Sequence, residues 1–169
     1  SITLNRVTGS EQSIINGSLN ANGQVFLLNS NGVLIGNGAS INAGGVVASS
    51  MSMSDDDFNA GNYVLNNNSS TASVINQGTI TASDGGYVVL AGQKVSNEGV
   101  INARLGHAAL ASGEKVSLNF NGNSLVSVSV DKETVDALVE NKQAIYADGG
   151  VVTMTAKAAN KALENVVNN

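Results

Sequence analysis

The chain repeats itself with a period of about 21 residues, and no other feature limits its architecture as strongly. The aligned segments are residues 74–82 with 95–103, 84–90 with 105–111, 17–21 with 39–43 and, in outline, 80–88 with 143–151. The first two pairs have an offset of 21 residues and the third an offset of 22. Such a period indicates a solenoid, in which each repeat forms one coil and packs on its neighbours.

The residues that recur within each repeat favour strands over helices. Val and Ile suit packed strands, whereas Asn and Gly tolerate the sharp turns between them. The leucine spacing of leucine-rich repeats is absent, so we predict an all-β fold, a parallel β-helix. At about 21 residues per coil, about eight coils would form a stack of roughly 35 Å. The predicted repeat corners are Asn76, Gly78, Gly85, Gly86, Asn97, Gly99, Gly149 and Gly150.

Composition excludes several classes of protein. The chain has no Cys, so it has no disulfide framework, thiolate metal site or Cys nucleophile. A net charge of −5 argues against nucleic-acid binding, which requires a basic patch. No apolar run is long enough to span a bilayer, and residues 1–5 do not resemble a signal peptide. The length of 169 residues fits one domain covering residues 1–169.

Three segments depart from the repeat. Residues 51–63 contain Ser54 followed by three Asp residues, which predicts a capped helical excursion. Residues 131–141 have apolar side chains at helical spacing and predict a short amphipathic helix or a turn. Residues 156–167 show the same spacing and predict a C-terminal helix that packs on the solenoid or caps its open end.

Residues 21–36 read ANGQVFLLNSNGVLIG and follow an Asn-Arg-Val-Thr segment at 5–8. This stretch resembles the secretion domain of two-partner-secretion exoproteins, the filamentous-haemagglutinin-like family. The family's Asn-Pro-Asn-Gly-Ile type motif corresponds here to Asn29, Ser30, Asn31, Gly32 and Val33. Further family-like segments are residues 44–50, 76–78, 84–88 and 97–101 with 103–106. Ser30 stands where the family usually has Pro, and the chain is expected to begin inside the domain, as a fragment that lacks an upstream part.

The resemblance implies a function that the repeats alone do not. It implies a right-handed β-helix that is the N-terminal secretion and folding module of a large adhesin, haemolysin or contact-dependent toxin of a Gram-negative bacterium. The implied partner is an outer-membrane barrel transporter of the TpsB type with periplasmic POTRA domains. The chain would pass through the barrel unfolded and fold outside, secreted or at the cell surface. The full-length protein would contact a host-cell or neighbouring-cell surface.

Each candidate site also has a plain structural explanation. The turn at Asn29–Gly32 is expected to be structural, with transporter recognition acting through it. Asp55, Asp56 and Asp57 are expected to form an acidic first turn of a helix and not a Ca²⁺ site. His107 is the only histidine, and with no Cys we expect neither a metal site nor a catalytic role for it. We therefore expect no cofactor and no enzymatic activity.

Two alternative functions remain open at this stage. One is a polysaccharide-active β-helix enzyme of the pectin-lyase type, which would need acids or an Arg or Lys base clustered in a groove. Arg6 and Arg104 are the only arginines and the acids are scattered, which argues against it. The other is an adhesive module that itself binds a surface. An aromatic content of 4% gives only weak support to a dedicated glycan site.

Overall fold

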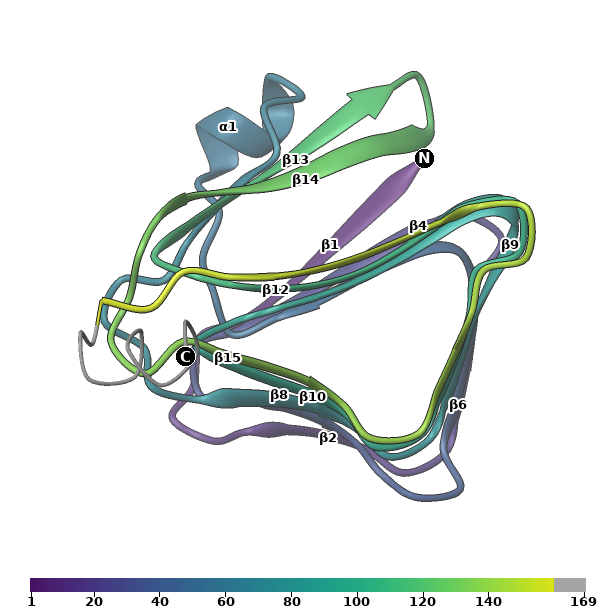
Figure 1. Cartoon of the computed structure of the whole chain (residues 1–169), viewed down its shortest axis with the longest axis horizontal. Coiled ribbons are helices and arrows are strands. Elements are labelled where there is room, and N and C mark those ends of the chain that lie inside the picture. Colours follow the sequence, from purple (N-terminus) through teal and green to yellow (C-terminus); the bar gives the residue numbers. More distant parts are fainter. Residues whose placement is uncertain (160–169) are drawn as a thin grey trace, which may run out of the picture.

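The chain winds into a parallel β-helix whose coils enclose a roughly triangular cross-section (Figure 1). The computed structural model describes residues 1–159. We call the three sides of the triangle the first, second and third face. The first face contains β1 (Ile2–Val7), β4 (Gln24–Asn29), the C-terminal parts of β6 (Ser40–Ser49) and β9 (Thr79–Ala91), β12 (His107–Ser112) and β17 (Val151–Ala156).

The other two faces contain shorter strands, again paired in parallel. The second face contains β2 (Ser13–Ile15), β5 (Val33–Ile35), β8 (Ser73–Asn76), β10 (Lys94–Asn97) and β15 (Leu138–Asn141). The third face contains β3 (Ser18–Asn20), the N-terminal parts of β6 and β9, β11 (Val100–Asn102) and β16 (Ala144–Tyr146). The predicted parallel β-helix is therefore confirmed.

The strand register reproduces most of the sequence repeat. Val74 pairs with Val95 and Ile80 with Ile101, both at the predicted offset of 21 residues. The alignment of residues 84–90 with 105–111 is wrong by one position, because Tyr87 pairs with His107. Ala82 lies five residues before Tyr87, whereas the equivalent Ala103 lies four residues before His107. The turn after Ala103 is therefore one residue shorter than the turn after Ala82.

The stack is shorter than the predicted eight coils. In residues 1–159, six strands stack on the first face and five on each of the others. The difference arises because residues 50–72 and 113–137 leave the coil. They form a cover outside the first face from α1 (Asp55–Asn59), β7 (Val64–Asn66), β13 (Lys115–Asn121) and β14 (Ser124–Lys132) (Figure 1).

The inside of the coil forms the larger core. Ile41, Ile80 and Ile101 stack from coil to coil and are each at most 3% exposed. Val88 and Leu90 fill the same interior from the first face. Because one aliphatic side chain lies directly above the next, each rung is covered by its neighbours, and burying such a side chain contributes about 1.5–3 kcal/mol.

A second core lies between the first face and the cover. Phe26 on the first face contacts Phe58 of α1 and Tyr63 edge to face, with ring centroids 6.1 and 5.5 Å apart. Phe120 of the β13–β14 hairpin contacts Tyr63 and Tyr87 at 5.3 and 5.1 Å. Burial, and secondarily the nearby Tyr63, raises the pKa of the Tyr87 phenol above its usual value, so this group stays protonated and donates to Gln24 Oε1. The cover is thus fixed by aromatic packing.

The three segments outside the repeat have different outcomes. The predicted helical excursion is confirmed, since Ser54 caps α1 and its hydroxyl accepts from the Asp57 N–H at 3.1 Å. The amphipathic helix at 131–141 is wrong and the turn alternative is correct. That segment joins the end of β14 to β15. Its apolar residues do not share one face, because Val139 packs into the coil from β15 whereas Val135 and Leu138 are exposed.

The C-terminal helix predicted at 156–167 lies largely outside the described residues. At its start, Ala156 ends β17 and Ala158 forms a parallel bridge with Thr134, so these residues are extended. Among the helices of residues 1–159, none has the length and apolar character needed to cross a membrane.

Candidate functional site

The segment Asn29–Val33 forms a tight turn between the first and second faces. The Gly32 N–H donates to the Asn29 carbonyl at 2.9 Å, and Gly32 has φ +105°. Neither Ser30 nor Asn31 has a positive φ, which fits a type I turn with Gly at its fourth position. The Asn31 N–H also donates to Asn29 Oδ1 at 2.9 Å, so the Asn29 side chain braces the turn from inside.

The two asparagines also tie this turn to the preceding coil. Asn29 is 1% exposed, and its Nδ2 donates to the Glu11 carbonyl and to Ser13 Oγ, each at 2.9 Å. Asn31 Nδ2 donates to the Gly9 carbonyl at 2.7 Å. Removing either amide would therefore loosen the contact between two coils as well as the turn itself.

Ser30 is the exposed residue of the motif. Its carbonyl accepts from Ser70 Oγ at 2.7 Å, which links the turn to the loop before β8 as well. Gly32 and Val33 are buried, and Val33 starts β5 on the second face. The geometry gives Asn29, Asn31 and Gly32 a structural part in the turn, while recognition by a transporter stays a prediction.

The predicted corner asparagines stack into a ladder. Asn76 Nδ2 donates to Asn97 Oδ1, and Asn97 Nδ2 donates to Asn141 Oδ1, both at 2.9 Å. Asn76 and Asn97 are fully buried, so the ladder satisfies amides that water cannot reach. Sequence reasoning missed Asn141, although the Val-x-Asn pattern shared by residues 95–97 and 139–141 was available as a signal.

The predicted corner glycines lie where neighbouring coils approach too closely for a side chain. A Cβ on Gly78 would lie 2.4 Å from the Ala39 carbonyl oxygen, and one on Gly99 would lie 2.1 Å from that of Gly78. At the corner between the third and first faces, Gly86 and Gly150 are equally confined. Sequence reasoning missed two glycines that stack with this second pair, Gly44 and Gly106. Gly85 and Gly149 precede the pair and have φ +80° and +71°.

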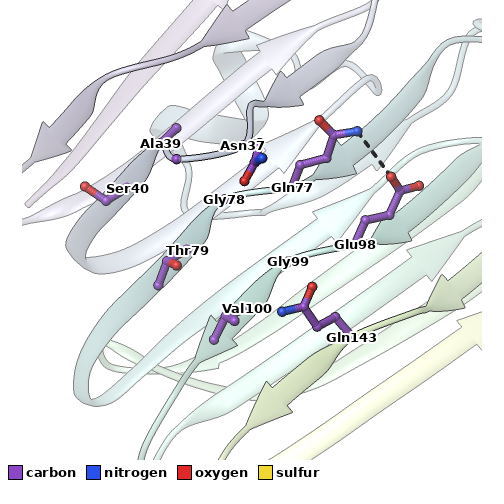
Figure 2. A pocket seen from close by; sticks show the side chains of 11 residues that line it. Asn37, Ala39, Ser40, Gln77, Gly78, Thr79, Glu98, Gly99, Val100 and Gln143 are labelled. Atoms are coloured by element: carbon purple, nitrogen blue, oxygen red, sulfur yellow. Dashed lines mark hydrogen bonds between the residues drawn. The ribbon is translucent and has the colours of Figure 1, made fainter.

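A polar groove of about 690 Å³ follows the corner between the second and third faces (Figure 2). Gly78 and Gly99 form part of its floor, and the side chains of Gln77, Glu98 and Gln143 line it. Gln77 Nε2 donates to Glu98 Oε1 at 3.2 Å. We call this the corner groove.

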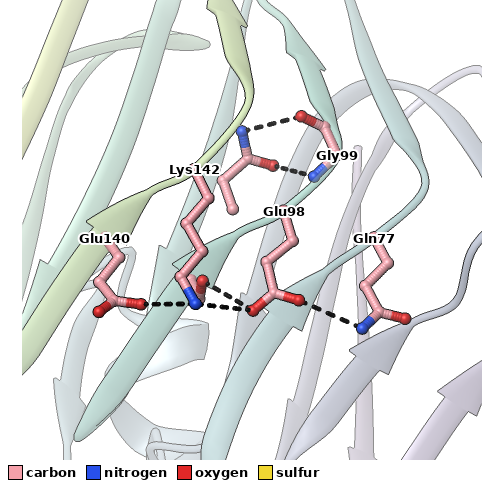
Figure 3. A network of polar contacts seen from close by, with 7 residues as sticks. Gln77, Glu98, Gly99, Glu140 and Lys142 are labelled. Carbon is pink, nitrogen blue, oxygen red and sulfur yellow. Dashed lines mark hydrogen bonds and ion pairs between the residues drawn. The ribbon is translucent and has the colours of Figure 1, made fainter.

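A short charge network borders the corner groove (Figure 3). Lys142 Nζ lies 3.8 Å from Glu98 Oε2 and 3.4 Å from Glu140 Oε2, and the Lys142 side chain is 57% exposed. Exposed ion pairs of this kind contribute about 0–1 kcal/mol. The network therefore adds weak surface contacts between neighbouring coils. Its one cation, Lys142, is already paired with the carboxylates of Glu98 and Glu140.

His107 and the acidic turn of α1 have structural partners. His107 is 3% exposed, with Nδ1 3.3 Å from the Leu125 carbonyl and Nε2 2.7 Å from Thr153 Oγ1. It thereby joins β12 to β14 and β17. Asp55 Oδ1 accepts from Arg6 Nη1 at 2.7 Å, which fastens α1 to the first strand. Throughout residues 1–159, no group of three His, Cys, Asp or Glu side chains is placed to hold a metal ion.

Comparison with known proteins places these features in a family. The TPS (two-partner-secretion) secretion domain model matches residues 1–169. Two heme/hemopexin-binding proteins of Haemophilus influenzae are 38% and 37% identical to the chain and match 96% and 99% of it. The matched regions are 18% and 20% of those proteins, so the chain spans about a fifth of their length.

A solved structure agrees with the sequence matches. The HMW1 secretion domain from Haemophilus influenzae superposes with a TM-score of 0.83 at 32% identity, over 96% of this chain and 46% of that chain. The resemblance seen at residues 21–36 is thereby confirmed. The coiled fold, the stacked corners and the whole-length match agree, and the chain belongs to the TPS secretion domain family.

Proposed function

We propose that this domain is the N-terminal secretion and folding module of a large exported adhesin, haemolysin or toxin of a Gram-negative bacterium. A TpsB-type outer-membrane barrel recognises it in the periplasm through its POTRA domains and conducts it unfolded to the cell surface, where it folds. The whole-length match to the TPS secretion domain is the observation that carries this proposal.

The physical properties of the chain support transport in an unfolded state. Without Cys, no disulfide can form in the oxidising periplasm and block threading. Most strand pairs join one coil to the next, as Val74 joins Val95 and Leu19 joins Ile41. Solenoids with such nearest-neighbour contacts can fold by propagation along the axis, one coil at a time.

The turn at Asn29–Val33 is proposed to act in secretion through the fold that it stabilises. Asn29 and Asn31 bond to the preceding coil, so losing them would disturb the first coils of the stack. Direct contact with the transporter would have to use mainly the exposed Ser30. The two roles can be separated, because Asn31 affects stability through its hydrogen bonds whereas Ser30 presents its side chain to solvent.

The test is secretion of this segment fused to a reporter, with and without the partner barrel. We expect the reporter in the medium only when the barrel is present, and equal release without it would contradict the proposal. Asn31→Ala should lower secretion and the melting temperature together, whereas Ser30→Ala should change neither. Lost secretion at an unchanged melting temperature in either variant would instead support direct recognition.

The pectin-lyase alternative has its own test. An enzyme of that type acting on polygalacturonate would release unsaturated products, which absorb ultraviolet light. Arg104, one of the two arginines, is engaged by Asp84 in an ion pair, so it is not a free base. We expect no unsaturated product from the purified domain.

A further inference from the structure

The outer surface of the third face carries two straight rows of side chains. In each short strand of this face the central residue points inward and its two neighbours point outward. The strand register places one outward row at Asn20, Asn42, Thr81, Asn102 and Tyr146. The second row is Ser18, Ser40, Thr79, Val100 and Ala144. The first row is richer in amides and ends in an aromatic ring.

A groove runs beside the first row, on the opposite side of the third face from the corner groove. It consists of two shallow hollows of about 460 and 390 Å³ that share Thr81 and Ala82, so they adjoin. Together they reach from Asn20 at one end to Tyr146 at the other. With rungs about 4.8 Å apart, this groove is about 20 Å long. We call it the amide groove.

The amides of this row are only partly used within the protein. Asn42 Nδ2 donates to Asn20 Oδ1 at 3.0 Å, and Asn102 Nδ2 donates to Thr81 Oγ1 at 3.2 Å. Within residues 1–159 these bonds leave Asn20 Nδ2, Asn42 Oδ1 and Asn102 Oδ1 without a protein partner. The groove thus presents one donor and two acceptors that are held in place by their neighbours, which suits ligands that bear many hydroxyl groups.

The downstream end of the amide groove adds charge and an aromatic surface. Arg104 and Asp84 form an ion pair there, with side chains 65% and 56% exposed. Tyr146 is 56% exposed, whereas the other five aromatic residues pack in the core beneath the cover. An exposed ring offers an apolar surface beside polar groups, on which the C–H face of a sugar ring can lie.

The charge of the amide groove narrows the ligand class. Its charged lining residues are Arg104, Asp84 and Asp148, a sum of −1. This net negative charge would repel uronate, sulfated and nucleic-acid polymers. The groove also lacks the cluster of basic residues that binds such polymers. The groove also has no large aliphatic side chain in its lining, so it does not suit the apolar face of a helix.

We propose that the amide groove binds an extended, uncharged polysaccharide along the axis of the β-helix. Asn20, Asn42, Thr81 and Asn102 bond to successive sugar hydroxyls, and Tyr146 supports one ring at the downstream end. This site uses amides and one aromatic ring, so the low aromatic content of the chain does not exclude it. The inference is independent of the proposed role in secretion.

The test is calorimetric titration of the purified chain with three uncharged hexasaccharides: cellohexaose, N-acetylchitohexaose and laminarihexaose. We expect saturable binding of at least one of them, and about tenfold weaker binding of the corresponding disaccharide, because a disaccharide engages fewer rungs. Hexagalacturonate should bind more weakly than the best uncharged probe. Failure of all three hexasaccharides to bind, or tighter binding of hexagalacturonate, would overturn the proposal.

Matched variants locate the site. Tyr146→Ala and Asn102→Ala should each weaken binding about fivefold, in line with the loss of a ring contact or a hydrogen bond. Thr79→Val in the second row and Gln143→Ala in the corner groove should bind like the parent chain. All four positions are at least partly exposed, and unchanged melting temperatures will verify folding. Equal losses in the groove variants and the controls would place binding elsewhere and refute the assignment.

Discussion

The two hydrophobic cores of this domain are built on different rules. The core inside the coil contains only aliphatic side chains, and Ile80 and Ile101 occupy the same position in successive coils. The core beneath the cover contains aromatic residues and methionines, and no two coils contribute the same set. The first is a repeated packing unit, whereas the second is a single assembly of segments that leave the coil.

This difference shows how a regular solenoid accommodates irregular parts. Inside the coil, each side chain must fit a copy of itself about 4.8 Å away, which favours β-branched and small residues. Beneath the cover, α1 and the β13–β14 hairpin meet the first face only once, so large rings in edge-to-face contact can fill the space. We therefore expect damage to the inner core to affect the whole stack, and damage to the second core to remain more local.

The largest effect is expected from Ile101→Ala in the inner core. Ile101 is fully buried between Ile80 and Ile145, so truncation leaves a cavity that the regular stack cannot close. We expect a loss of about 3 kcal/mol in the free energy of unfolding, measured by urea denaturation. The control is Val100→Ala in the same strand, which points outward and should lose less than about 1 kcal/mol. Equal losses would contradict the stacked core.

A smaller loss is expected from Asn97→Ala in the buried ladder. Asn97 bonds to Asn76 above and Asn141 below, and its Nδ2 also donates to the Ala144 carbonyl at 2.9 Å. Leaving these buried partners unsatisfied should lower the unfolding free energy by about 2 kcal/mol.

Asn141→Ala is the matched control for this ladder, because Asn141 is exposed and has its ladder partner on one side. Asn141→Ala should lower the unfolding free energy by less than half as much as Asn97→Ala. If the two variants melt at the same temperature, the buried part of the asparagine ladder does not stabilise the fold.

A local effect is expected from Phe58→Ala in the second core. Phe58 is half-buried and contacts Phe26 and Tyr63, so its loss should lower the unfolding free energy by about 1.5 kcal/mol. Hydrogen exchange should accelerate in residues 54–66 and 115–132 and stay unchanged in β10 and β11. Val126→Ala, at an exposed position of the hairpin, is the control. Faster exchange throughout the stack would show that the two cores are one cooperative unit.

The smallest effect on stability is expected from a substitution in the Asn29–Val33 turn that does not touch either core. Ser30→Pro should raise the unfolding free energy by about 0.5 kcal/mol, because Ser30 occupies the second position of a type I turn, where proline fits. The same change at Ser69, which has φ +65°, should destabilise the domain. Calorimetry of both variants tests the pair, and a lower melting temperature for Ser30→Pro would refute the turn assignment.

The sequence predicted most of the coil-to-coil register and the helix α1 in one inserted segment, but not the β13–β14 hairpin of the other or the strand β15 of the second face. The offset between Val74 and Val95 is visible along the chain because coil-to-coil contacts recur at a fixed separation. The strand at 138–141 was open to interpretation as a helix, because a turn followed by a strand can match helical spacing by chance over a few residues. In the candidate turn, the motif residues were found from their order, but the partners Glu11, Ser13 and Gly9 were not.

The sequence by itself determined that the chain coils, the length of its regular repeat, and several of the residues that turn the corners. It did so because parallel stacking translates a fixed period into contact between like residues. The tertiary structure alone decided where the departing segments pack. Val64 pairs with Ser117, which lies 53 residues later in the sequence, and no repeat in the sequence indicates this pairing. It also decided that five residues from five coils line one amide groove, because register and not local sequence brings them into a row.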